Sequence, residues 1–98
     1  MRREAVLKAL KQEIDKNSDL LYYGSEVLDA PVVAYLKNFE TGEGCLLGCN
    51  NIDELEEQYN CNYYEFLENG LELVRLFVEG QEVRFSTRIK INVISTLE

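Results

Sequence analysis

Hydrophobic residues near the N-terminus recur at the spacing of one helix face. Val6, Leu7, Leu10 and Ile14 would share one side of a helix over residues 3–17. The lysines and other polar residues of this stretch fall on the remaining sides. Such a pattern is typical of a helix that packs one stripe against a core and exposes the rest to water.

A β-hairpin is predicted next. Residues 32–39 are rich in β-branched and aromatic side chains, and Pro31 just before them is tolerated at the start of a strand. A glycine-containing turn at 40–44 leads into 45–49, which would return antiparallel to the first strand. Both faces of this hairpin are largely apolar, so the pattern leaves its register open.

Two short helices should follow, because the chain twice shows the pattern of a capping box. Asn51 precedes Glu54 by three residues, and Asn62 precedes Glu65 by the same spacing. Asn-Gly at 69–70 is a strong signal for the end of the second helix. The apolar positions expected to face the core are Ile52, Leu55 and Tyr59 in the first helix and Tyr63, Phe66 and Leu67 in the second.

The last third of the chain predicts a second, longer hairpin with strands at 71–78 and 83–93. A two-residue type II′ turn at Gly80–Gln81 would join them. This register places Val78 opposite Val83 and gives the hairpin one apolar face. The other face would carry Arg75, Phe77, Arg84, Arg88 and Lys90.

The order of these elements predicts a single α+β domain over residues 1–98, with an antiparallel sheet and its helices on one face. A hydrophobic content of 46% in 98 residues is enough for a core without disulfides. No apolar run approaches the roughly 20 residues of a membrane span, and charges return too soon after the N-terminus for a secretion signal. We therefore expect a cytoplasmic protein with no membrane partner.

Charge is distributed unevenly along the chain. Between Glu40 and Glu82 there are eleven carboxylates and one cation, Arg75. Residues 1–39 balance six acids against six bases, and residues 83–98 hold three bases against one acid. The net charge of −8 thus arises in the middle, where repulsion between like charges weakens the compact state.

Two interpretations fit this acidic middle. The carboxylates could simply solvate two surface helices, or they could form a docking surface for a basic protein, as the lack of interspersed cations favours. Clustered helix carboxylates can imitate the phosphates of a DNA strand. We therefore expect a stoichiometric inhibitor of a basic nucleic-acid-handling protein (a nuclease, restriction enzyme or CRISPR effector), encoded by a phage or mobile element. The predicted partner-binding residues are Asp53, Glu54, Glu56, Glu57, Tyr64, Glu65 and Glu68.

A rival hypothesis is a structural module that forms homodimers through the second hairpin. Arginine and aromatic residues are enriched at protein interfaces, and the final strand could lie at a sheet edge. The predicted interface residues are Leu73, Arg75, Phe77, Arg84 and Arg88. Direct binding of nucleic acid to the same basic residues is not expected of a chain whose net charge is −8.

The sequence offers little for catalysis or metal binding. It has no histidine and no nucleophile-elbow motif, so we expect neither an enzyme nor a cofactor. Cys45, Cys49 and Cys61 match a zinc site weakly, because the fourth ligand would have to be a carboxylate. We expect these thiols to act as small hydrophobic side chains and expect no metal.

Overall fold

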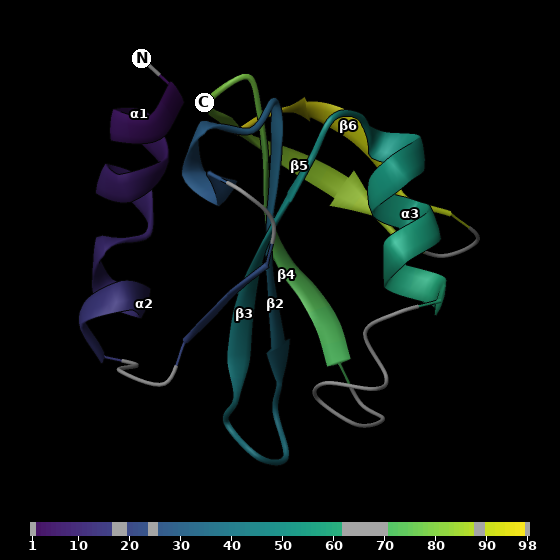
Figure 1. Cartoon of the computed structure of the whole chain (residues 1–98). Helices are drawn as coiled ribbons and strands as arrows, with labels where there is room; N and C mark the ends of the chain where they lie inside the picture. Colours follow the sequence, from purple (N-terminus) through teal and green to yellow (C-terminus); the bar gives the residue numbers. More distant parts are fainter. Residues whose placement is uncertain (1, 17–19, 24–25, 62–70, 88–89, 98) are drawn as a thin grey trace.

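One six-stranded sheet with helices on both faces organises the part of the chain that the structure describes (Figure 1). This computed structural model describes residues 2–16, 20–23, 26–61, 71–87 and 90–97. Along the chain the elements are α1 (Arg2–Ala9), α2 (Lys11–Lys16), β1 (Leu21–Tyr23), the short 3₁₀ helix η1 (Val27–Asp29), β2 (Val32–Asn38), β3 (Gly44–Cys49), α3 (Ile52–Cys61), β4 (Leu71–Val78), β5 (Gln81–Ser86) and β6 (Asn92–Thr96). The predicted α+β class is confirmed.

The strands lie in the order β1-β3-β2-β4-β5-β6. All neighbours are antiparallel except β1, which runs parallel to β3, so the sheet is mixed and not purely antiparallel. The predicted first hairpin is confirmed as β2 and β3, with Val32 opposite Cys49 and Leu36 opposite Cys45.

The predicted N-terminal helix is present as two consecutive segments, α1 and α2. Helical hydrogen bonds continue across their junction, because Leu10 N donates to Val6 O and Ile14 N donates to Leu10 O, both at 2.9 Å. Val6 and Leu10 are fully buried, and Leu7 and Ile14 pack against the same cluster. The predicted apolar stripe is therefore confirmed.

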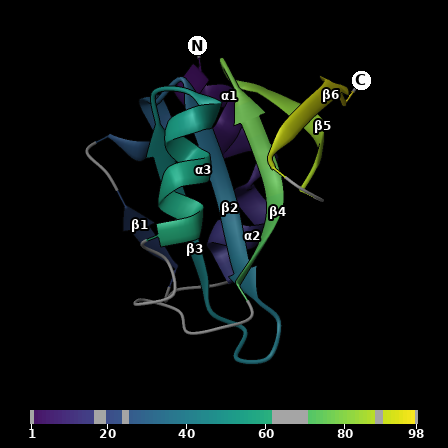
Figure 2. The ribbon, with the colours of Figure 1, turned by 90° about the vertical axis from the view of Figure 1, so that its right-hand side faces the viewer.

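The prediction that the helices share one face of the sheet is wrong. Val6 of α1 packs in one core cluster, together with Leu10 at the junction of α1 and α2. Leu55 of α3 packs in a second cluster on the other face. Figures 1 and 2 show the sheet between these two layers. The physical reason is that residues 32–36 of the central strand β2 are all buried, so each face of the sheet needs a cover.

The second hairpin forms, but with a different turn. Glu79 and Gly80 form it with φ of 51° and 82°, which matches a type I′ turn and not the predicted type II′. Leu76, and not Val78, lies opposite Val83. This difference of two residues keeps the same side chains on the same face. Glycine is required at position 80, because a Cβ there would lie 2.9 Å from the Cα of Arg2.

The predicted long final strand is wrong, because its residues form two strands. β5 ends at Ser86, and β6 returns antiparallel beside it, with Phe85 opposite Val93 and Val83 opposite Thr96. As a result β6, and not β5, forms the edge of the sheet.

The first of the two predicted capping boxes is confirmed at its N-cap. Asn51 Oδ1 accepts a hydrogen bond of 2.8 Å from Glu54 N at the start of α3. Leu55 is fully buried, and Ile52 and Tyr59 pack against the same cluster as predicted. The second predicted helix lies outside the described residues. No helix in the described ranges is long and apolar enough to cross a membrane.

Candidate acidic binding surface

Helix α3 carries four of the predicted partner-binding residues. Asp53 and Glu57 are exposed, whereas Glu54 and Glu56 are partly buried. Leu55 is the anchor that fixes this arrangement, because its full burial against the sheet directs the flanking carboxylates toward the rim and the solvent side of the helix. The remaining predicted contacts, Tyr64, Glu65 and Glu68, lie outside the described residues.

The two partly buried carboxylates make local hydrogen bonds. Glu54 Oε2 accepts one of 3.1 Å from Asn50 Nδ2, next to the N-terminus of the helix. Glu56 Oε2 accepts one of 2.7 Å from the backbone N–H of Ile91, which connects α3 to the segment that leads into β6. Glu56 therefore contributes to the fold, while Asp53 and Glu57 make no such contact with a described residue.

No described lysine or arginine neutralises the α3 carboxylates. Among the described residues, every ion pair involves α1, α2 or Arg75. The pairs are Arg2–Glu79, Arg3–Asp29, Lys11–Asp15, Arg75–Glu13 and Arg75–Glu82. The helix thus presents negative charge without an internal counterion in the part of the chain that is described.

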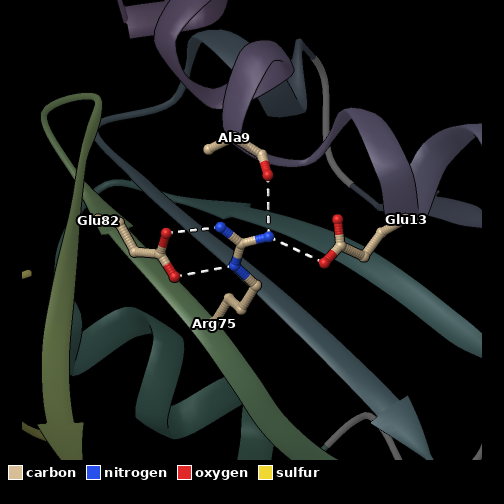
Figure 3. A network of polar contacts seen from close by, with 4 residues as sticks. All are labelled: Ala9, Glu13, Arg75 and Glu82. Carbon is tan, nitrogen blue, oxygen red and sulfur yellow. Dashed lines mark hydrogen bonds and ion pairs between the residues drawn. The ribbon is translucent and has the colours of Figure 1, made fainter.

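Arg75 is the one cation between Glu40 and Glu82, and its side chain makes its hydrogen bonds on the face of the sheet opposite to α3 (Figure 3). Its guanidinium donates two hydrogen bonds to Glu82, at 2.6 and 2.8 Å. It donates two more, each of 2.9 Å, to Glu13 and to the carbonyl of Ala9 at the end of α1. The hydrogen bond with Glu82 is the main reason that the pKa of Arg75 is raised. The sequence indicated this cation, but Glu13 lies 62 residues away from it and gave no signal.

A groove beside α3 adds two carboxylates that the sequence did not indicate. It has a volume of about 370 Å³ and is lined by Glu54 of α3 together with Glu26 and Asp29 from the η1 region. Asp29 is paired with Arg3 at 3.3 Å. Glu26 and Asp29 come from the charge-balanced first third of the chain, so only the folded structure could show that they lie near α3.

The basic face predicted for the second hairpin is not one exposed surface. Leu73 is buried with the α3 cluster and Phe77 with the α1 cluster, on opposite faces of the sheet. The cause is a bulge, since Tyr35 pairs with Arg75 and Leu36 with Leu73, which leaves Val74 without an opposite residue. Helices α1 and α2 also cover Arg75. Arg84 is exposed, and Arg88 lies outside the described residues.

Two of the cysteines are free thiols inside the sheet. Cys45 and Cys49 are buried in β3, and burial raises the pKa of each to about 12. Both thiols are therefore protonated at neutral pH, which suits packing better than nucleophilic chemistry. In the described ranges, no three His, Cys, Asp or Glu side chains are grouped to hold a metal ion.

Comparison with models of protein families, with curated proteins and with solved structures finds no match for this chain.

Proposed function

We propose that this protein acts by stoichiometric binding of a basic, nucleic-acid-handling protein through the exposed carboxylates of α3. The observation that carries the proposal is the lack of any counterion for these carboxylates among the described residues, while the one nearby cation in sequence, Arg75, is bound on the other face. A partner that supplies lysine or arginine would complete the missing charge pairs.

The spacing of the carboxylates supports mimicry of nucleic acid. Asp53 and Glu57 are four residues apart on one helix, which corresponds to a rise of about 6 Å. A DNA strand likewise presents one phosphate about every 3.4 Å along its axis, so it also carries a row of negative charges a few ångströms apart. A groove that binds consecutive phosphates can therefore contact both carboxylates, and the partner would be a nuclease, restriction enzyme or CRISPR effector.

The charge also explains how the partner would be found. Unpaired surface carboxylates attract a basic surface from a distance and raise the association rate, and salt screens this effect beyond about 8 Å at physiological ionic strength. Simple solvation of a surface helix predicts no such dependence. The two interpretations are therefore separated by experiment.

The test is capture of interacting proteins from the host lysate on the immobilised full chain, with double-stranded DNA as the competitor. We expect a basic nucleic-acid-binding protein to be retained at low salt and released by DNA. The variant Asp53→Asn/Glu57→Gln should lose most of the captured protein. The matched control is Glu40→Gln/Glu43→Gln, which removes two exposed carboxylates from the β2–β3 turn and should retain it. Equal capture by both variants would contradict the proposal.

A further inference from the structure

The edge strand β6 is exposed along its whole length. All five of its residues are exposed, and no described strand pairs with its outer side. Figure 2 shows it at one margin of the sheet. Large exposed hydrophobic side chains gather here, because Val93, Ile94 and Leu97 remain 42%, 66% and 46% exposed. Such an edge offers backbone donors and acceptors to another strand.

This edge lacks the charged side chains and prolines that commonly protect an edge strand. Residues 91–97 contain no charged residue and no proline, although 29% of the whole chain is charged. A bulge is present, since Ser95 pairs with Arg84 and Val93 with Phe85, leaving Ile94 without an opposite residue. A bulge can protect an edge by twisting it away from a second strand. The extra residue here is Ile94, the most exposed large hydrophobic side chain among the described residues, so the bulge leaves an apolar group at the edge.

We propose that β6 pairs antiparallel with β6 of a second copy of this chain, about a two-fold axis near Ile94, to form a homodimer with a continuous sheet. This interface uses other residues than the acidic surface of α3, and the inference does not depend on the proposed function. The structure supports a second copy as the occupant through the charge of the strand and through the symmetry of the pairing.

Charge favours a copy of the same strand over a charged partner strand. β6 has no side chain with which a basic or acidic strand could form ion pairs. Along the chain the nearest described charge is Lys90, which lies before the strand and is exposed, and Arg84 lies on the neighbouring strand β5 opposite Ser95. Antiparallel pairing about Ile94 places the two copies of Lys90 at opposite ends of the interface, so the paired strands bring no charged side chain of their own into the contact despite the net charge of −8 on each chain.

Symmetry favours β6 with β6 over β6 with the other edge of the sheet. The opposite edge, β1, has only three residues and would give a short pairing. Pairing of β6 with β1 of the next copy would also generate a ring or an open-ended filament, whereas pairing of β6 with itself closes at two subunits.

The dimer should be of moderate affinity, and added salt should not weaken it. Two five-residue strands and their flanks bury an area at the low end of specific interfaces, below about 1,200 Å². Added salt screens repulsion between the two acidic chains, so dimerisation should hold or strengthen. Binding through α3 should weaken under the same conditions, which distinguishes failure of this inference from failure of the proposed function.

The experiment is sedimentation of the full chain from about 5 to 500 µM, a range suited to a small interface. We expect the wild-type chain to pass from monomer to dimer. Ile94→Lys should raise the dimer dissociation constant at least tenfold, because it places two lysines at the axis. The matched control, Tyr22→Lys, changes an exposed residue on β1 and should dimerise as the wild type does.

Hydrogen exchange on the wild-type chain provides a readout that needs no variant. Backbone amides of β6 should exchange more slowly as the protein concentration rises, while those of β1 should not change. A chain that stays monomeric throughout, a dimer that survives Ile94→Lys, or one that is lost in Tyr22→Lys would overturn the proposal.

Discussion

The two faces of the sheet use acidic residues in different ways. On the α1/α2 face, carboxylates pair with cations, and Arg75 alone binds both Glu13 and Glu82. On the α3 face, Asp53 and Glu57 have no cationic partner among the described residues. The first arrangement holds elements together. The second adds repulsion without a described internal partner, and our proposal that α3 binds a basic partner rests on this difference.

If both faces depend equally on apolar packing, removing a buried leucine from either should have the largest effect on stability. Leu10→Ala on the α1/α2 face and Leu55→Ala on the α3 face each remove a fully buried side chain. We expect each to lower the free energy of unfolding by about 3 kcal/mol, measured by urea denaturation. A loss below about 1 kcal/mol at either site would show that the corresponding helix is not packed as described.

Among the described residues, ion pairs should stabilise only the α1/α2 face. Arg75→Ala leaves the partly buried Glu13 and Glu82 without their guanidinium, so we expect a loss of about 2 kcal/mol in the free energy of unfolding. The control Arg84→Ala removes an exposed arginine from the neighbouring strand β5 and should cost less than about 0.5 kcal/mol. Equal effects of the two substitutions would mean that the Arg75 network does not hold α1 and α2 on the sheet.

The α3 carboxylates should differ in how much each contributes to the stability of the fold. Glu56→Ala removes the acceptor for the backbone N–H of Ile91 and should cost about 1 kcal/mol, whereas Glu56→Gln keeps an acceptor and should cost less. Glu57→Ala, which removes a carboxylate with no described partner, should change stability by under about 0.5 kcal/mol. Thermal denaturation of the three variants ranks their stabilities. A larger loss of stability for Glu57→Ala than for Glu56→Ala would contradict this prediction.

Local patterns were enough to predict the elements that depend on neighbouring residues. The apolar stripe of residues 6–14, the first hairpin and the Asn51 cap all follow from spacing within a few positions. The face on which each helix packs does not, because periodicity defines the apolar side of a helix but not the side of the sheet that it covers. The positive φ of Glu79 was missed because Glu-Gly is an unusual type I′ pair.

The candidate site was predictable in part for the same reason. Asp53 and Glu57 are four residues apart on one helix, so their shared location could be anticipated. The hydrogen bond from Ile91 to Glu56, the groove carboxylates Glu26 and Asp29, and the partners of Arg75 all join distant parts of the chain. No local pattern encodes such contacts.

Association kinetics with the captured partner test the central claim most directly. The rate constant for association would be measured for the wild type, Asp53→Asn/Glu57→Gln and Glu40→Gln/Glu43→Gln at about 50 and 300 mM salt. The account predicts that the α3 variant associates roughly tenfold more slowly at low salt, that the control is close to the wild type, and that the difference shrinks at high salt. Equal rates for the two variants at low salt would contradict the account, because net charge alone would then explain any attraction.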